Sequence, residues 1–168
     1  MVNEKDEPSG VSMIHGNTED LFNIAEIQIM YRNKVNVKDR PKISTSQDAH
    51  KILLSTWDMN RIELLEQFKV LLIDRRNACI GISEIATGGI AGCVADPKII
   101  FATALKARAS GIILAHNHPS GNLTPSEADI AITKKMKEAG KFLEIEIMDH
   151  IIETSEKYFS FADEGLMP

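Results

Sequence analysis

Hydrophobic and polar positions along this chain form short apolar runs and periodic stretches that are separated by polar turns. Apolar runs bounded by turn residues predict strands, and apolar positions that recur every three or four residues predict helices. Strands are expected over residues 24–31, 68–73, 80–87, 112–115, 143–148 and 158–161, and helices are expected to begin near Asp48, Pro97 and Pro125. The order of helix, hairpin, helix, strand, helix and strand predicts an α/β fold in which helices sandwich a mixed β-sheet.

Capping residues indicate where two of the helices start and end. Asp96 followed by Pro97 has the cap-then-proline pattern of a helix start. Thr124 is predicted to cap the next helix, with Glu127 as its capping-box partner. Gly140 is predicted to end that helix, because glycine readily adopts the left-handed backbone of a helix C-terminus.

Length and charge limit the classes to which the protein can belong. The 168 residues suffice for one domain with a hydrophobic core and are too few for a (β/α)8 barrel. We expect a disordered or loosely held tail over residues 1–20 and a single domain over 21–168. A formal net charge of −5 does not forbid nucleic-acid binding, but it removes the simplest argument for it, a large positive surface.

Targeting signals and disulfides are not expected. No apolar run approaches the length of a membrane span, and the first twenty residues are polar and acidic, so we expect a cytoplasmic protein without membrane contact. Cys79 and Cys93 are too few for a disulfide framework and lack the spacing of a metal site. We interpret them as ordinary reduced thiols.

The candidate chemistry follows one of the apolar strands. Side chains alternate along a strand, so His116 and His118 point to the same side and can share a metal ion, whereas Asn117 points away. Ser126 and Asp129 lie three residues apart on one face of the following helix. That face can be directed toward the two histidines. Two imidazoles and one carboxylate form a three-ligand site whose fourth position is left to water, an arrangement typical of catalytic zinc.

The spacing of these residues resembles a known motif. His-x-His-Pro, followed by Ser eight and Asp eleven positions after the second His, is similar to the JAMM motif of the JAB/MPN metallohydrolases. The segments HNHPSG, PSEAD, MDHII and YFSF resemble the RadC-like branch of that family. The resemblance implies the JAB/MPN (cytidine-deaminase-like) architecture and one Zn²⁺ per chain held by His116, His118 and Asp129. It further implies a hydrolase that cleaves a peptide or isopeptide amide bond, in which Ser126 holds the water or stabilises the oxyanion.

Such hydrolysis also needs a carboxylate that moves a proton without itself holding the metal. The upstream candidates are Glu63, Glu66 and Glu84. Glu84 lies inside a predicted strand and Glu63 lies on the polar side of a short amphipathic stretch, so both have ordinary surface explanations. Glu66 immediately precedes an apolar strand, and the resemblance to RadC-like chains places the upstream glutamate there. Periodicity alone leaves the choice among the three open.

Asp149 and His150 form a further pair of candidate side chains at the end of a predicted strand. They could bind a metal directly, orient a loop, or supply hydrogen bonds to groups that bind it. Direct ligation is the less favoured interpretation, because His116, His118 and Asp129 already complete a three-ligand set.

Two other functions remain as alternatives to a hydrolase. The association of RadC with DNA repair implies a nucleic-acid-interacting protein whose metal site is not a peptidase, and the basic segment over residues 32–42 is the candidate contact for weak, non-specific binding. The letters His-Asn-His coincide with the HNH nuclease motif by accident, because the residues of that motif are spread over a ββα-metal element. A non-catalytic interaction domain is the other alternative, although every motif position is occupied here. The expected substrate is a protein or peptide, whose identity would be set by loops without a readable code.

Overall fold

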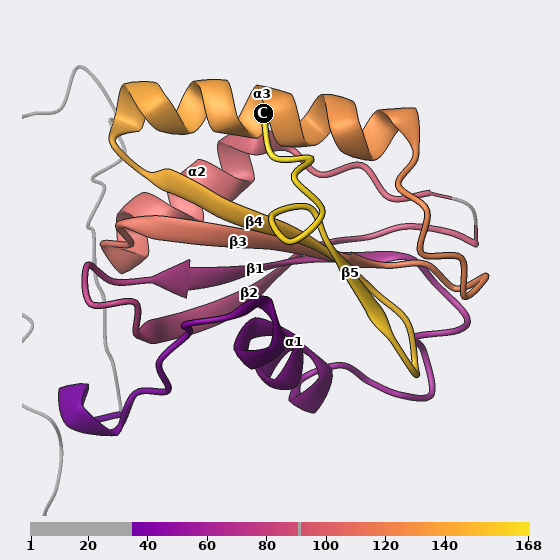
Figure 1. Ribbon diagram of the computed structural model, residues 1–168, viewed down its shortest axis with the longest axis horizontal. Helices are drawn as coiled ribbons and strands as arrows, with labels where there is room; N and C mark the ends of the chain where they lie inside the picture. Colours follow the sequence, from indigo (N-terminus) through magenta and orange to yellow (C-terminus); the bar gives the residue numbers. More distant parts are fainter. Residues whose placement is uncertain (1–34, 91) are drawn as a thin grey trace, which may run out of the picture.

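The computed structural model describes residues 35–90 and 92–168, and it has one mixed β-sheet with helices on both faces (Figure 1). This arrangement confirms the predicted α/β fold. In chain order the elements are the 3-10 helix η1 (Val37–Asp39), α1 (Ser46–Ser55), β1 (Gln67–Ile73), β2 (Cys79–Thr87), α2 (Pro97–Ala107), β3 (Gly111–Asn117), α3 (Glu127–Leu143), β4 (Glu146–Glu153) and β5 (Tyr158–Ser160). The tail predicted over residues 1–20, the strand predicted over 24–31 and the first three residues of the basic segment lie outside the described residues.

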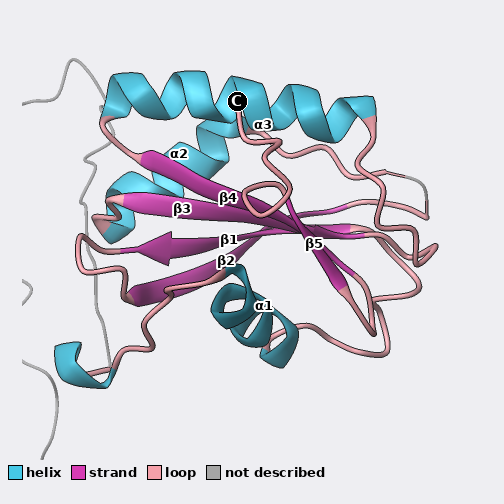
Figure 2. Ribbon diagram, viewed as in Figure 1, coloured by secondary structure: helices cyan, strands magenta, loops and turns pink. Residues whose placement is uncertain are grey.

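The sheet has the strand order β2-β1-β3-β4-β5. β1 pairs antiparallel with β2 and β3, β3 pairs parallel with β4, and β4 pairs antiparallel with β5. Parallel neighbours need a crossover connection, which α3 supplies between β3 and β4. Gln67 pairs with Thr87 and Phe68 pairs with His116, so the start of β1 lies beside the ends of β2 and β3. The loops that follow β2 and β3 therefore meet the segment before β1 at one end of the sheet (Figure 2).

Alternate side chains of β1 and β3 face two separate hydrophobic cores, and both strands are buried along their whole length. The first core lies under α2 and α3 and includes Phe68, Val70, Leu72, Ile100, Ala104, Ile112, Leu114 and Met136. The second lies under α1 and includes Ala49, Leu53, Trp57, Leu71, Ile73, Ile113, Ala115 and Ile151. Figure 1 shows α2 and α3 on one face of the sheet and α1 on the other. Because side chains alternate along β3, His116 continues the row that faces α3, and Asn117 continues the row that faces α1.

The predicted helix start is confirmed at α2, while α1 begins at Ser46, two residues before Asp48, and α3 begins two residues after the predicted Pro125. Asp96 caps α2 through its side chain, as predicted. At α3 the N-cap is Ser126 rather than Thr124, and the helix begins at Glu127. The capping box is formed by Ser126 with Asp129 three residues later, and not by Thr124 with Glu127. A carboxylate at the third helical position therefore decides where this helix starts.

The predicted end of α3 is also wrong. The helix continues through Gly140 to Leu143, and Glu144 ends it in the left-handed conformation with φ 54°. Gly140 serves close packing instead, since a Cβ at this position would collide with the carbonyl oxygen of Ile145. The Ile145 N–H in turn donates a hydrogen bond to the Gly140 carbonyl oxygen over 2.9 Å. Glycine is therefore required here for the approach of the next segment and not for its left-handed backbone.

The strand that follows lies later in the chain than predicted. It covers Glu146–Glu153 instead of residues 143–148, because residues 143–145 belong to the helix end and its turn. Asp149 and His150 consequently lie inside β4 rather than at its end. Both side chains are buried.

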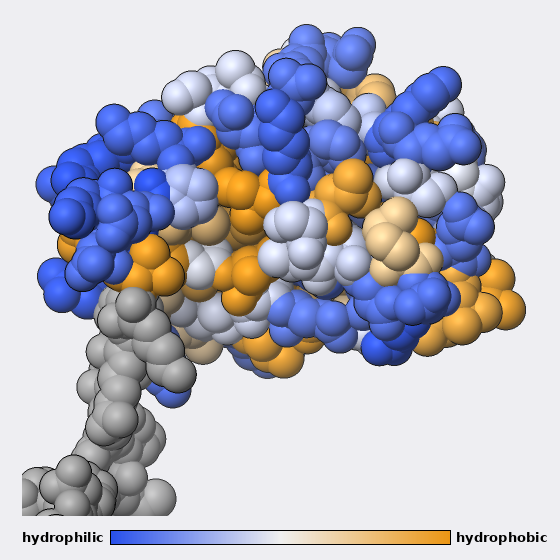
Figure 3. All heavy atoms as spheres, turned by 90° about the horizontal axis from the view of Figure 1, so that it is seen from below, coloured by the Kyte–Doolittle hydropathy of each residue, from blue (hydrophilic) through white to orange (hydrophobic). Residues whose placement is uncertain are grey.

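The surface of the described residues carries both hydrophilic and apolar side chains. Among the described residues, no helix is both long enough and apolar enough to cross a membrane. On the face that carries α1, hydrophilic side chains surround several separate apolar patches (Figure 3). Cys79 and Cys93 are free thiols, as predicted.

Candidate metal centre

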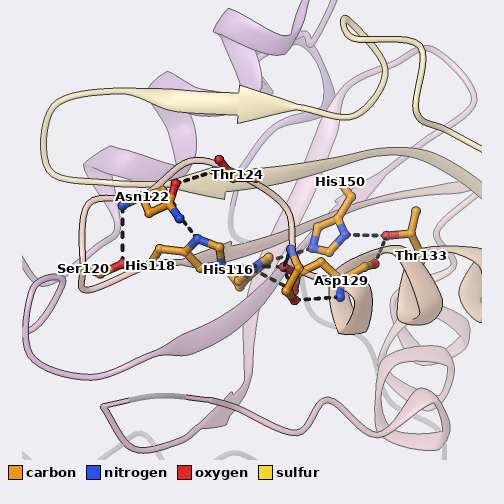
Figure 4. Close-up of polar contacts among 9 residues, drawn as sticks. His116, His118, Ser120, Asn122, Thr124, Asp129, Thr133 and His150 are labelled. Atoms are coloured by element: carbon orange, nitrogen blue, oxygen red, sulfur yellow. Dashed lines mark hydrogen bonds and ion pairs between the residues drawn. The ribbon is translucent and has the colours of Figure 1, made fainter.

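Three side chains bring one potential ligand atom each to a single point between β3 and α3 (Figure 4). These atoms of His116, His118 and Asp129 all lie within 4.8 Å of one another. The Nε2 atom of His116 lies 2.9 Å from Nε2 of His118 and 3.1 Å from Oδ1 of Asp129. Nε2 of His118 lies 3.7 Å from Oδ2 of Asp129. The structure therefore brings together the three residues that the sequence predicted as ligands.

The histidines are held by the strand and by the first turn after it. His116 is the last side chain of β3 on the α3 side and is 1% exposed. His118 lies one residue beyond the strand, where its backbone N–H donates to the carbonyl oxygen of Glu153 over 3.0 Å. Its ring Nδ1 lies 2.5 Å from the carbonyl oxygen of Asn122, so that Nε2 faces the cluster. Both rings are thus oriented by partners on the side away from the cluster.

Asp129 is positioned by the capping box of α3. Its Oδ2 accepts hydrogen bonds from the backbone N–H and from the hydroxyl of Ser126, both over 2.7 Å. Burial alone would raise the pKa of the Asp129 carboxyl, but the two histidines outweigh it and hold that pKa well below its usual range. Asp129 in turn raises the pKa of His118 against the opposing effect of burial. The carboxylate is therefore ionised at neutral pH, as a metal ligand must be.

His150 contacts the ring of His116 on the side away from Asp129. Its Nε2 lies 2.9 Å from Nδ1 of His116, which is the ring nitrogen on the side away from Asp129. Its Nδ1 lies 2.6 Å from the hydroxyl of Thr133 on α3. Burial, followed by the nearby His116, lowers the pKa of His150 well below its ordinary value. Of the interpretations left open for this residue, a hydrogen bond to a metal ligand is the one that the geometry favours.

Asp149 has a different role from its neighbour. Its carboxylate accepts hydrogen bonds from the Ser160 hydroxyl over 2.6 Å and from the Ala162 N–H over 2.9 Å. It therefore ties β4 to the turn after β5. It does not belong to the group of potential metal ligands among the described residues.

A cleft of about 620 Å³ opens beside the three donor atoms. Glu66, Ser126, His116, His118 and Asp129 all line it. Glu66 is half-buried at the segment before β1, where its N–H donates to Gly89 O over 2.9 Å and its carbonyl oxygen accepts from Gly88 N–H over 2.8 Å. Its backbone is thus paired with the segment that follows β2.

The other two candidate glutamates lie outside the lining of this cleft. Glu63 is exposed and accepts a hydrogen bond from the Ser155 hydroxyl over 2.6 Å. Glu84 is exposed on β2 and accepts from the Gln67 side chain over 2.8 Å and from the Thr87 hydroxyl over 2.7 Å. Among the three upstream candidates, Glu66 is the one that lines the cleft with the donors.

Asn117 holds the backbone on both sides of Glu66. Its Oδ1 accepts from the Gln67 N–H over 2.7 Å, and its Nδ2 donates to the carbonyl oxygens of Leu65 over 2.8 Å and Ile62 over 2.6 Å. The side chain is fully buried. The residue between the two histidines therefore fixes the segment that carries the glutamate.

Sequence reasoning missed the roles of Asn117 and Thr133 and placed His150 at a strand end. All three are polar residues, and all three are buried. A buried polar side chain must be hydrogen-bonded, so its occurrence within a buried stretch is a signal for a structural or functional contact. That signal gives no partner, because the partners lie far away in the sequence.

Comparison with known proteins agrees with this geometry. The family model described as the RadC-like JAB domain matches residues 43–166. The chain is 45% identical over 126 residues to a UPF0758 protein of Flavobacterium johnsoniae. The matched region covers 74% of this chain and 53% of the relative. It is 37% identical over 145 residues to a UPF0758 protein of Syntrophomonas wolfei, which covers 85% of this chain and 61% of the relative.

A UPF0758 protein of Clostridium beijerinckii is 33% identical over 152 residues, or 90% of this chain and 65% of the relative. The chain thus spans between about half and two thirds of the length of these three relatives. The family match covers almost all of the described residues, including the elements that carry His116, His118 and Asp129. The chain therefore belongs to the RadC-like JAB domain family.

Proposed function

We propose that this protein is a zinc-dependent hydrolase that cleaves an amide bond, in a peptide or an isopeptide. The observation that carries the proposal is the shared cleft: three potential metal ligands and Glu66 line the same cavity. A hydrolase needs both a metal site with an open position and a carboxylate close to it that is not a ligand.

The residues present fit a zinc ion. Imidazole nitrogen and carboxylate oxygen are ligands that zinc accepts, and catalytic zinc sites use three protein ligands. His116, His118 and Asp129 supply such a set, and their donor atoms already converge. When bound, zinc supplies Lewis acidity, which polarises a carbonyl oxygen and lowers the pKa of water.

The chain's own residues supply the rest of the chemistry. The Glu66 carboxylate takes a proton from the attacking water and passes it to the leaving amine nitrogen as the carbon–nitrogen bond breaks. Asn117 holds the backbone of Glu66 in place through the neighbouring residues Leu65 and Gln67. Ser126 fixes the orientation of the Asp129 carboxylate, and its position in the cleft lining supports a further contact with the substrate's oxyanion.

The form of the cleft supports a peptide-like substrate. Its lining includes the aliphatic side chains of Ile90 and Val94, which are 78% and 89% exposed. It also includes polar residues such as Ser120 and Asn122. A binding site with apolar walls and a few polar groups suits a chain of amino acids.

The proposal is tested first by the metal content of the freshly purified protein. We expect about one zinc per chain in the wild type and in Glu66→Gln, and a strongly reduced content in His118→Ala and Asp129→Ala. Equal metal content in Asp129→Ala and wild type would remove Asp129 from the ligand set.

Activity is then measured on a panel of short peptides and isopeptides, with duplex and single-stranded DNA as control substrates. Glu66→Gln should keep the fold but lose on the order of a hundredfold or more in turnover, because Gln preserves the shape and cannot accept the proton. Glu84→Gln is the matched control, since Glu84 is exposed and outside the cleft lining, and it should keep wild-type turnover. Cleavage of DNA instead of peptides would overturn the proposed substrate, and full activity of Glu66→Gln would place the base elsewhere.

A further inference from the structure

A chain of buried hydrogen bonds runs from α3 to the back of His116 (Figure 4). The Thr133 hydroxyl lies 2.5 Å from the carbonyl oxygen of Asp129 and 2.6 Å from Nδ1 of His150. Nε2 of His150 lies 2.9 Å from Nδ1 of His116. Thr133, His150 and His116 are at most 1% exposed, so water is not available to these atoms as an alternative partner.

The single hydroxyl proton of Thr133 fixes the direction of every bond in this chain. A carbonyl oxygen can only accept, so the hydroxyl donates its proton to Asp129. The hydroxyl oxygen then accepts from His150, which must carry its proton on Nδ1. Nε2 of His150 is left with a lone pair and accepts from Nδ1–H of His116. His116 is therefore protonated on Nδ1, and its Nε2 is the ring nitrogen that faces the cluster.

A single hydrogen bond places a proton on Nδ1 of His118 as well. Its Nδ1 lies 2.5 Å from the carbonyl oxygen of Asn122, which can only accept, so His118 is also protonated on Nδ1. Both imidazoles consequently leave Nε2 as the ring nitrogen that faces Asp129 and that can bind a metal ion once its proton is released. His118 is set by a backbone atom, whereas His116 is set by two side chains that can be replaced.

We infer that Thr133 and His150 are positioning residues that select the tautomer of His116 and so make its Nε2 available to a divalent metal ion. This inference rests on the proposed function, because the proposed zinc is the ion that Nε2 would bind. Without the Thr133 hydroxyl, Nδ1–H of His150 would lose its acceptor. His150 would then be more stable with its proton on Nε2, donated to Nδ1 of His116. His116 would then carry its own proton on Nε2, the atom needed for the metal.

The first test reads the tautomers directly and needs neither metal nor activity. The full chain has five histidines, so long-range proton–nitrogen NMR of the ¹⁵N-labelled, metal-free protein can resolve each ring, with assignments from single variants. We expect His150 to be protonated on Nδ1 and unprotonated on Nε2, and His116 to be protonated on Nδ1. A proton on Nε2 of His150 in the wild type would overturn the inference.

The second test compares Thr133→Val with Thr133→Ser, which keeps the hydroxyl. Zinc affinity is measured by competition with a chromophoric chelator, and we expect Thr133→Val to bind about tenfold to a hundredfold more weakly while Thr133→Ser binds like the wild type. The NMR spectrum of Thr133→Val should show His150 no longer confined to the Nδ1–H form. Thr103→Val is the matched control, because Thr103 donates in the same way to the carbonyl of Ile99, four residues before it on α2, over 2.8 Å, and is half-buried away from the cluster.

The outcomes separate this inference from the proposed function. Wild-type zinc affinity in Thr133→Val, or an unchanged His150 tautomer in that variant, would overturn the positioning role even if the enzyme is active. Absence of zinc binding by the wild type would defeat the proposed function, while the wild-type tautomers would still decide whether the hydrogen-bond chain exists. A Thr133→Val protein that does not fold leaves the wild-type spectrum as the deciding measurement.

Discussion

Replacement of Asn117 by alanine removes the contact that fixes the glutamate segment to β3. The side chain makes three hydrogen bonds, one to the Gln67 N–H and two to the carbonyl oxygens of Ile62 and Leu65. It is fully buried. Asn117→Ala therefore leaves one donor and two acceptors without their partner in the interior.

The expected loss of stability follows from these three bonds. A buried hydrogen bond contributes about 1 kcal/mol net, so three bonds amount to about 3 kcal/mol, and unsatisfied buried partners increase this cost. For a domain of this size, such a loss lowers the melting temperature by about 6–12 °C. Asn60→Ala is a suitable control, because Asn60 is exposed and its side chain donates to Asp58 at the surface over 3.1 Å. That variant should change stability by less than about 0.5 kcal/mol.

Urea denaturation followed by circular dichroism measures both variants against the wild type. Turnover and zinc content are measured on the same Asn117→Ala preparations. We expect zinc content to be retained, since Asn117 points away from His116 and His118, and turnover to fall further than the folded fraction explains. A loss of stability below about 1 kcal/mol, or unchanged turnover, would refute the view that Asn117 positions Glu66.

Three other predictions concern packing, pH and nucleic acid. Gly140→Ala should destabilise the protein by about 1–3 kcal/mol in urea denaturation, because the new methyl group meets the Ile145 carbonyl; a neutral effect would contradict this. Burial raises the pKa of Glu153 from 4.5 to about 8, and its partner His50, 2.7 Å away, has a pKa lowered by burial. The fold thus favours the protonated carboxyl, so stability should fall as pH rises from about 4.5 to 8, and Glu153→Gln should weaken this dependence; equal unfolding free energies from urea titrations of the wild type at pH 5 and pH 8 would argue against it. Binding to DNA, if detected through the basic segment over residues 32–42, should be weak and should fall steeply with salt, and tight binding at raised salt would support the nucleic-acid alternative.

The sequence predicted most of the fold because the strands and helices of this protein follow their local patterns. The fully buried strand β3 contains a continuous apolar run over residues 112–115, and Asp96 caps α2 as predicted. The errors lie at the two ends of α3, where the capping box of Ser126 with Asp129 sets the start and the packing of Gly140 against the next segment overrides a glycine helix end. α3 continues past Gly140 because that residue is needed against Ile145, which propensity for a helix end cannot reveal.

The candidate site shows the same division between local and distant information. The alternation of His116 and His118 along one strand follows from strand geometry, so their shared side could be predicted. The contact of His150 with His116 depends on the parallel register of β3 and β4, which are joined through a long helix. Local sequence contains no measure of that register, so the hydrogen-bond partner of His116 could not be predicted.

The distance between the proposed base and the proposed metal depends on one backbone register. Phe68 of β1 pairs with His116 of β3, and this pairing places Glu66 just before the strand, in the lining of the cleft. A slip of one residue would shift Glu66 by about 3.3 Å and reverse the face of every side chain on β1. Asn117 opposes such a slip, because its three bonds recognise both an N–H and carbonyl groups at defined positions before and at the start of β1. The two histidines and the asparagine between them thus act on opposite faces of β3. One face gathers the potential metal ligands, and the other holds the neighbouring segment in the register that places Glu66 in the same cleft lining.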